Sequence, residues 1–370
     1  MSKKGKVLVA MSGGIDSTMS AVLLHEEGWD VVGLTMKTWD YASSGSSKKE
    51  TGCCSLDSIN DARQVAVDIG FPHYIVDMRE EFGDSVIDNF TSEYIAGRTP
   101  NPCIMCNTHI KWDALLRKAD MMDCEFIATG HYARIGHADD RYFISKGPDN
   151  KKDQSYVLWG LTQDVLKRTM FPVGWMIKTD IRKMAEERGF LDLSKKKDSY
   201  EICFIPDNDY RSFLLRKHPE LVDIKGKFLD VNGNIIGEHN GYPFFTVGQR
   251  KGLGINLGKP AFVTEIRPET NEVVLGDYED LKRDVMCVNK VNLQKVSSIT
   301  EGMRVTTKVR YKHRGEASTL SPTQYDKTGA IVNFMAPVPG IAPGQSAVFY
   351  DGDDVIGGGI IYSTDNAELV

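Results

Sequence analysis

The sequence lacks any long apolar run, and no stretch approaches the roughly eighteen apolar residues that a membrane-spanning helix requires. Its first residues also lack the apolar segment and small-residue cleavage site of a secretory signal, because Met1–Lys6 leads directly into a short strand-like run. We therefore expect a cytoplasmic protein with no membrane partner.

Cysteines are few, and acidic residues outnumber basic ones. Seven cysteines in 370 residues are odd in number and too sparse for a disulfide scaffold, so we expect some in the core and others to be reactive or to bind metal. The formal net charge of −6 gives no general attraction for nucleic acid. Any RNA binding must therefore depend on local basic clusters.

The chain is too long for one ordinary core, and two or three domains are expected. Its first part alternates predicted strands and helices, which indicates a parallel sheet covered by helices. The strands are expected at Lys6–Met11, Val31–Met36, His73–Asp77 and Phe126–Gly130, and the helices at Asp16–Glu27, Ser55–Ile69 and Asn107–Met122. Tyr41–Thr51 is expected to be a mobile loop.

After about Pro206 the composition changes to short strands and turns. Evenly spaced strand-like runs in the last part predict a small barrel or sandwich. They are Arg304–Tyr311, Ala317–Leu320, Ala330–Phe334, Ser346–Tyr350 and Val355–Tyr362. The fold class is therefore α/β, with a Rossmann-like domain at 1–205, a central β-rich domain at 206–282 and a β-barrel at 283–370.

The string Ser12-Gly-Gly-Ile-Asp-Ser17 directly follows the first predicted strand. Its glycines allow the backbone to approach an anion, and the next helix presents unpaired N–H groups to that anion. Asp16 differs from these anion-binding groups because its carboxylate repels phosphate. We therefore expect it to hold Mg²⁺ that faces the phosphates. An ordinary strand–turn–helix connection is the alternative, and the full string favours a nucleotide site.

Three cysteines lie in distinctive surroundings. Prolines place Cys103 and Cys106 at the start of a helix predicted near Asn107, where a thiol pKa is lowered. Cys203 follows the lysines at 195–197. A buried core cysteine and a structural zinc site are the competing interpretations, although a zinc ribbon would need a second Cys-x-x-Cys that the sequence lacks.

Further strings occur in a fixed order along the chain. They are Thr99-Pro-Asn-Pro-Cys103 with Cys106-Asn107, Ala128-Thr-Gly-His-Tyr132, Lys152-Asp-Gln-Ser-Tyr156, Cys203-Phe-Ile-Pro206, Gly248-Gln-Arg-Lys-Gly252, Pro343–Gly352 and Gly357-Gly-Gly359. With the first loop, which resembles the PP-loop of adenylating ATP pyrophosphatases, they closely resemble the bacterial tRNA-specific 2-thiouridylase family over essentially the whole chain. Some members carry aspartate where this chain has Cys103, so the acid–base role proposed for that aspartate is not transferred to the thiol.

The resemblance implies a sulfurtransferase that uses ATP and Mg²⁺ to convert wobble uridine 34 of tRNAs for Lys, Glu and Gln to 2-thiouridine. The uridine O2 becomes an adenylate, and a persulfide on Cys203 supplies the sulfur: its terminal sulfur attacks C2, or Cys106 first releases it as hydrosulfide. In either case Cys106 ends in a disulfide with Cys203. A cysteine desulfurase or sulfur-relay protein is the expected donor. The implied ATP-binding residues are Ala10, Met11, Ser12, Gly13, Gly14, Ile15, Asp16, Ser17, Met36 and Gly130.

The implied RNA contacts lie in several segments. Asn101, Pro102 and Cys103 match the loop that receives the flipped target base. The other implied tRNA contacts are His131, Lys152, Asp153, Gln154, Arg310, Tyr311 and Gln345. Lys308, Arg310, Lys312 and Arg314 would share one face of a strand, either as a solvated face or as a phosphate-binding surface.

Three alternatives remain open from the sequence. Cys103, Cys106 and Cys203 could instead ligate an iron–sulfur cluster with one open iron. The chain could be another PP-loop ligase, such as an argininosuccinate synthetase, or a redox-sensing RNA-binding protein without enzymatic activity. The adjacent pair Cys53 and Cys54 has no evident role.

Overall fold

The computed structural model describes residues 4–39, 55–196, 202–205, 207–323 and 328–364, so the predicted loop Tyr41–Thr51 and the pair Cys53 and Cys54 lie outside the described residues. The chain forms two compact units. The first unit comprises residues 1–86, 103–209 and 353–355, and the second comprises 87–102, 210–352 and 356–370. The first part of the chain therefore contributes a segment, 87–102, to the second unit. No helix in the described part of the chain is long and apolar enough to cross a membrane.

The first unit is built on a parallel sheet with strand order β3-β2-β1-β4-β7. Its strands are β1 (Lys6–Ala10), β2 (Asp30–Lys37), β3 (His73–Asp77), β4 (Phe126–Ala128) and β7 (Thr169–Met170). Val7, Leu8 and Val9 are completely buried, as expected for a central parallel strand covered on both faces. The predicted parallel sheet is confirmed.

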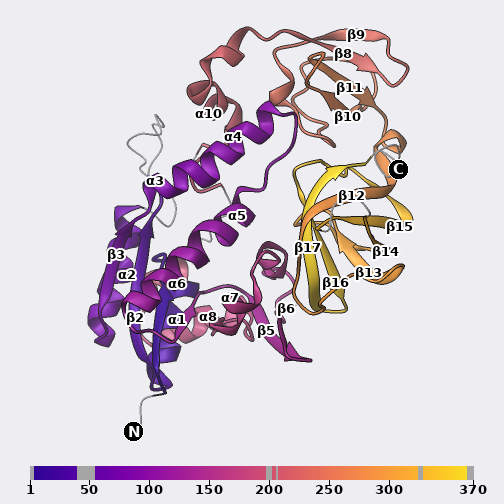
Figure 1. Ribbon diagram of the computed structural model, residues 1–370. Helices are drawn as coiled ribbons and strands as arrows, with labels where there is room; N and C mark the ends of the chain where they lie inside the picture. Colours follow the sequence, from indigo (N-terminus) through magenta and orange to yellow (C-terminus); the bar gives the residue numbers. More distant parts are fainter. Residues whose placement is uncertain (1–3, 40–54, 197–201, 206, 324–327, 365–370) are drawn as a thin grey trace. The chain divides into compact units, whose positions relative to one another are not determined.

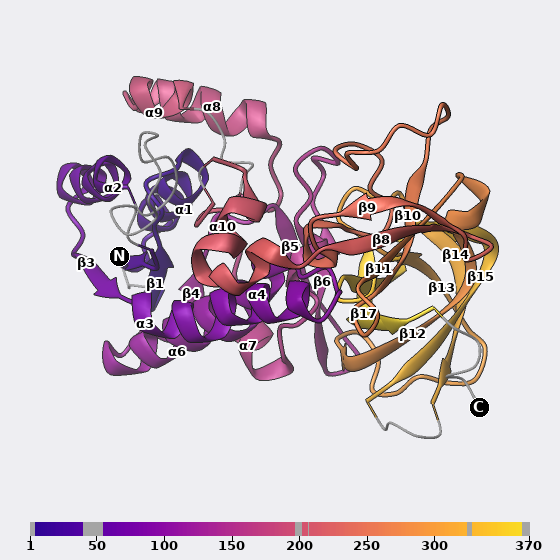
Figure 2. The same cartoon turned by 90° about the horizontal axis from the view of Figure 1, so that it is seen from above.

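Helices cover both faces of this sheet, and Figure 2 shows α1 and α2 on one side and α6 on the other. The helices are α1 (Ile15–Glu26), α2 (Leu56–Ile69), α3 (Arg79–Phe82), α6 (Trp112–Met121), α7 (Gln163–Lys167), α8 (Lys178–Glu187) and α9 (Leu191–Lys195). The Ser55 side chain caps α2 by accepting from the Ser58 N–H, and Gly70 ends it at φ +94°. These local signals explain why the sequence predicted α2 closely.

Two features of the first unit were not predicted. One is a hairpin of β5 (Ala133–Ala138) and β6 (Arg141–Lys146), whose turn residues Asp139 and Asp140 both have positive φ. The other is an earlier helix start: the prediction that this helix begins near Asn107 was wrong. A short helix α5 (Pro102–Met105) and a π-helical turn η3 (Cys106–Lys111) precede α6. Proline is favoured at a first helical position because it has no N–H to leave unpaired, so the prolines mark this start.

The second unit contains a four-stranded sheet and a barrel (Figure 1). The sheet has the order β10-β11-β8-β9, with strands β8 (Gly226–Asp230), β9 (Ile235–His239), β10 (Phe262–Arg267) and β11 (Glu272–Gly276). Helices α4 (Asp88–Ile95) and α10 (Tyr210–Lys217) belong to the same unit. Phe90 packs edge-on against Phe213, and Tyr94 stacks on Tyr210 at 4.9 Å.

The barrel runs β12-β15-β14-β13-β16-β17 and closes through pairing of β12 with β17. Its strands are β12 (Lys282–Leu293), β13 (Met303–Lys308), β14 (Glu316–Pro322), β15 (Ala330–Pro339), β16 (Ser346–Asp351) and β17 (Asp354–Ser363). Inward-facing Val305, Leu320 and Val332 are buried in its core. The predicted barrel is confirmed, but β13 ends at Lys308. Arg310, Lys312 and Arg314 therefore lie in a turn and do not share a strand face.

Candidate active site

The predicted nucleotide loop joins β1 to α1 and folds back on itself. Ser17 Oγ accepts a hydrogen bond from the Ser12 N–H at 3.0 Å and donates to the Gly14 carbonyl at 3.1 Å. Gly14 occupies the N-cap position of α1 and provides no side-chain cap. The twelve-residue helix therefore directs its first N–H groups and positive dipole end into the loop, which favours an anion there.

Two glycines make this loop possible through close backbone approach. Gly13 has φ +67°, and a Cβ on it would lie 1.9 Å from the Ser58 carbonyl oxygen. A Cβ on Gly130 would lie 2.6 Å from both the Asp16 carbonyl carbon and the Ser17 nitrogen. Gly130 thus packs against the first turn of α1. Of the other predicted positions, Met11 and Ile15 are buried, whereas Ala10 and Met36 are half-buried.

Asp16 forms an ion pair with a lysine that the sequence did not predict. Lys178 Nζ lies 2.7 Å and 2.6 Å from the two Asp16 carboxylate oxygens, and the Tyr132 hydroxyl lies 2.5 Å from Oδ1. The Lys178 side chain is only 9% exposed, and its backbone N–H donates to Asp149. No sequence pattern links positions 162 residues apart, so only the fold reveals this pair.

The Asp16–Lys178 pair changes the expected electrostatics of the loop. The ammonium balances the carboxylate and gives the site a buried cation beside the start of α1, which suits phosphate better than an isolated carboxylate would. A Mg²⁺ ion on Asp16 would compete with Lys178 for the same oxygens. The anion-binding N–H groups and the lysine fit a nucleotide triphosphate, with Asp16 available to the metal only after Lys178 moves.

A second lysine holds the loop from the other side. Lys196 Nζ donates to the Gly13 carbonyl at 3.0 Å, to Ser58 Oγ at 3.1 Å and to Asp61 at 2.8 Å. The Lys196 ammonium is therefore bonded to the nucleotide loop and α2.

Cys103 and Cys106 lie three residues apart near the start of the helix, so they share one side of it. Cys106 is buried and begins the π-helical turn η3, a deformation that occurs frequently at functional sites. The turn is fixed by Asn107, whose side-chain amide donates to the Val157 carbonyl. Cys103 reaches solvent, yet surrounding protein raises the pKa of its thiol, an effect that the charge of Lys111 only partly opposes.

Cys203 is half-buried and lies beside an aromatic anchor. Its neighbour Phe204 is buried and packs edge-on against Phe82 of α3 at 5.8 Å. Helix α3 also packs against η3, the turn that begins at Cys106. The segments carrying the two predicted catalytic cysteines therefore meet the same short helix.

The described cysteines form no disulfide in this structure. Within the described ranges, no three His, Cys, Asp or Glu side chains are grouped as metal ligands, although Cys103, Cys106 and Cys203 are all described. The observed geometry therefore gives no support to the iron–sulfur alternative.

The predicted RNA contacts of the first unit also have structural roles. The Gln154 side-chain carbonyl accepts from the Tyr132 N–H, and the Asp153 carboxylate accepts from the Ser155 N–H. Burial, with a smaller effect from Lys111, lowers the pKa of His131 to about 3, so its ring is neutral. Lys152, which directly precedes Asp153 and Gln154, is half-buried.

In the second unit, Gln345 holds the segment that directly precedes the residues predicted to receive the target base. Its side-chain amide donates to the Thr99 and Pro100 carbonyls at 3.1 Å and 3.0 Å, directly before Asn101. Arg310 donates to the Pro339 carbonyl at 3.1 Å, and the neighbouring Tyr311 is exposed. Gln345 therefore has an observed role in positioning this loop.

Three family models match consecutive parts of the chain. Their descriptions are tRNA methyl transferase HUP domain at residues 5–207, tRNA methyl transferase PRC-barrel domain at 211–277 and aminomethyltransferase beta-barrel domain at 283–361. They agree with the parallel-sheet, central and barrel architecture described above.

Curated relatives match nearly the whole chain, and their names concern thiolation. A tRNA-specific 2-thiouridylase MnmA from Cytophaga hutchinsonii is 60% identical over 98% of this chain and 99% of its own length. The MnmA of Amoebophilus asiaticus is 61% identical (97% and 96%), and that of Salinibacter ruber is 53% identical (100% and 97%). A solved 4-thiouridine synthetase–RNA complex with bound ATP is 20% identical with a TM-score of 0.35, covering 58% of this chain and 51% of that one, a likeness too weak to place any residue.

Proposed function

The chain belongs to the tRNA-specific 2-thiouridylase family, and from this membership we propose the course of its reaction and the residues that perform it. The enzyme is a tRNA sulfurtransferase that makes 2-thiouridine and binds ATP. We propose that it acts in the cytoplasm on wobble uridine 34 of tRNAs for Lys, Glu and Gln. The observation that carries the proposed chemistry is the buried Lys178–Asp16 pair at the start of α1.

ATP activates the uridine for sulfur transfer. The α1 N-terminus, with Ser12, Ser17 and the backbone around Gly13, binds the triphosphate. Uridine O2 attacks the α-phosphate, pyrophosphate leaves, and O2 becomes part of an adenylate. Lys178 stabilises the negative charge that develops on the phosphate oxygens. Asp16 would hold Mg²⁺, which would supply screening of the remaining phosphate charge.

The two cysteines supply the sulfur. Cys203 carries a persulfide from a cysteine desulfurase or sulfur-relay protein, and the terminal persulfide sulfur attacks C2 of the adenylated uridine. Cys106 loses its proton and attacks Cys203 Sγ, which releases the transferred sulfur as the thiocarbonyl while AMP leaves. The transferred sulfur is reduced and the two thiols are oxidised to a Cys106–Cys203 disulfide, which a thiol reductant resets before the next turnover.

The target base is received by Asn101, Pro102 and Cys103. Gln345 supports this assignment because it fixes the carbonyls directly preceding Asn101. Cys103 forms part of the surface that receives the base, and surrounding protein raises the pKa of its thiol, which disfavours the thiolate that sulfur transfer needs. The tRNA contacts are proposed at His131, Lys152, Asp153, Gln154, Arg310, Tyr311 and Gln345.

A tRNA assay tests this proposal directly. Purified enzyme, ATP, Mg²⁺, a desulfurase with labelled cysteine and a tRNA transcript should yield labelled 2-thiouridine, AMP and pyrophosphate, measured by mass spectrometry of the nucleosides. Transcripts with cytidine at position 34 are the matched control. Formation of AMP without tRNA, or thiolation that survives loss of Cys203, would contradict the proposed course.

A further inference from the structure

The Gly248-Gln-Arg-Lys-Gly252 string has no part in the chemistry above, yet it begins a closed loop in the second unit. The Gly248 N–H donates to the Val263 carbonyl at 2.8 Å, and the Val263 N–H donates to the Gln249 carbonyl at 2.9 Å. These bonds pin both ends of the intervening loop. The loop encloses a hollow of about 600 Å³ lined by residues 250 and 252–257 and 259–261.

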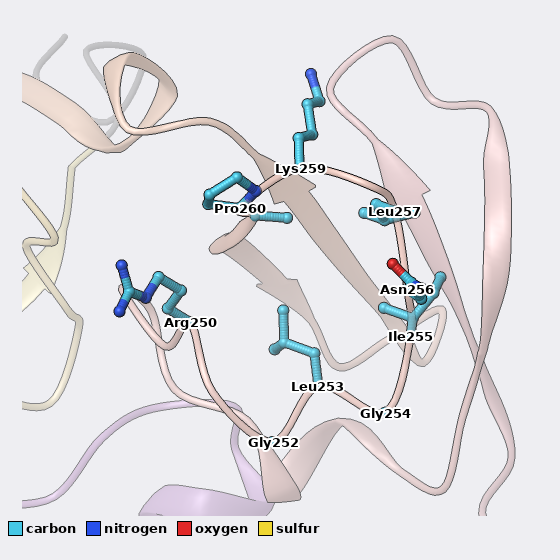
Figure 3. A pocket seen from close by; sticks show the side chains of 10 residues that line it. Arg250, Gly252, Leu253, Gly254, Ile255, Asn256, Leu257, Lys259 and Pro260 are labelled. Atoms are coloured by element: carbon cyan, nitrogen blue, oxygen red, sulfur yellow. The ribbon is translucent and has the colours of Figure 1, made fainter.

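The loop has a fixed shape because its apolar side is packed. Leu253 is buried and points into the ring in Figure 3, and Ile255 packs against Gly237 of β9. Arg211 donates to the Gly252 carbonyl at 3.2 Å while its guanidinium lies 5.5 Å from the Phe245 ring centroid. A loop held at these points pays little ordering entropy when it binds a ligand.

The outer side of the loop is positively charged. Arg250, Lys251 and Lys259 are exposed, and Figure 3 shows the Arg250 and Lys259 side chains extending outward from the ring. Residues 240–264 contain no aspartate or glutamate, although the whole chain has a net charge of −6. The loop is therefore a local cationic feature on an acidic protein.

This loop lies beside the basic turn that follows β13. A Cβ on Gly248 would be 3.7 Å from the Gly340 Cα, and Arg310 donates to the Pro339 carbonyl next to it. Residues 302–315, which include Arg310, contain five lysines and arginines and no acidic residue. The contact between Gly248 and Gly340 thus brings together two cationic segments that are distant in sequence.

We propose that Arg250, Lys251 and Lys259 form, together with the basic turn around Arg310, a continuous surface that binds the phosphate backbone of tRNA. This inference rests on the proposed function, because it takes tRNA as the polyanion. The loop provides cations and no assigned base contact, so it positions the tRNA without reading its sequence. Its contribution is to binding, whereas the chemistry occurs in the first unit.

The test measures the salt dependence of tRNA affinity. The Arg250→Ala/Lys251→Ala double variant and the wild-type enzyme are titrated with fluorescent tRNA between about 50 and 200 mM KCl. Lys227→Ala is the matched control, because Lys227 is exposed in the same unit but lies between Glu238 and Glu272 on the neighbouring strands. Removing two phosphate contacts should lower the slope of log K against log salt by about 1.5 and reduce the salt-induced loss of affinity roughly tenfold.

The double variant should also raise KM for tRNA while the single-turnover rate at saturating tRNA stays that of the wild type. A slope equal to that of the wild type, or a change no larger than that of Lys227→Ala, would overturn the proposal. So would a lowered rate at saturating tRNA with an unchanged KM. Absence of tRNA binding by the wild-type enzyme would instead refute the proposed function.

Discussion

At the level of single residues, the site depends on a lysine that the fold brings to Asp16. Lys178→Met replaces the ammonium with an apolar group of similar length, and we expect AMP formation to fall about 100-fold to 1000-fold, the loss typical of a charge-stabilising donor. Binding of tRNA should be unaffected because Lys178 belongs to the first unit, whereas the proposed cationic surface belongs to the second. Quench-flow measurement of AMP, with filter binding of tRNA, checks both.

Asp16→Ala is expected to abolish AMP formation as well, and also to destabilise the protein. It leaves Lys178 buried without its partner, which costs up to about 3–5 kcal/mol for fully buried pairs and less here, because the Asp16 side chain is 29% exposed. Lys183→Met on the same helix is the control, since Lys183 is exposed. Wild-type AMP formation in either Asp16→Ala or Lys178→Met would disprove the role of the pair.

The three cysteines should separate by function. Cys203→Ser should neither acquire a functional persulfide nor make 2-thiouridine. Cys106→Ser should still accept labelled sulfur from the donor, because Cys203 remains, but should fail in multiple turnover. Cys103→Ser should be milder, since its thiol has a raised pKa and neither transfer step uses it.

Sulfur-35 labelling of the protein under non-reducing conditions distinguishes these outcomes, with nucleoside mass spectrometry as the activity measurement. Equal and severe loss of activity in all three variants, together with loss of bound iron, would favour the iron–sulfur alternative. Full activity of Cys203→Ser would eliminate both routes.

At the level of elements, the nucleotide loop tolerates a side chain at one glycine and not at its neighbour. Gly13→Ala places a Cβ 1.9 Å from the Ser58 carbonyl at φ +67°, and the left-handed backbone alone costs about 1–2 kcal/mol. Gly14→Ser is the matched control, because Gly14 has ordinary extended dihedrals and serine is a favourable N-cap. We expect the thermal midpoint to fall by at least roughly 2 °C for Gly13→Ala and to change little for Gly14→Ser. Equal thermal midpoints for the two variants would show that α2 shifts to accommodate the added Cβ.

Local signals explain which elements the sequence predicted. Ser55 and Gly70 bound α2 through a side-chain cap and a left-handed residue, and both effects depend only on neighbouring residues. The helix starts at Pro102 and not near Asn107, because proline breaks a helix in its interior but is accepted in its first turn. Its acceptable place in the first turn becomes evident only when the rest of the helix is seen.

For the whole molecule, the nucleotide loop and the cysteines were predicted from continuous strings with their own chemistry, and the barrel from the spacing of strand-like runs. They did not reveal Lys178 at Asp16 or Lys196 at Gly13, because these contacts join separate elements and leave no periodic pattern. Nor did they show that Arg310 leaves its strand to bond the Pro339 carbonyl. The boundaries at 205 and 282 stay a prediction.

Segments of the two units alternate along the chain, so we expect its first part to aggregate when it is produced alone. A fragment of residues 1–207 retains α4 but lacks α10, so Phe90 loses Phe213 and Tyr94 loses Tyr210. Two aromatic side chains of about 150–250 Å² each then reach water and create an apolar patch of the size that promotes association. We expect this fragment to aggregate, as measured by size-exclusion chromatography with light scattering.

The same fragment carrying Phe90→Ser and Tyr94→Ser should be more soluble, because the patch is removed while the parallel sheet is untouched. A monomeric wild-type fragment would show that α4 is not held by the second unit in solution.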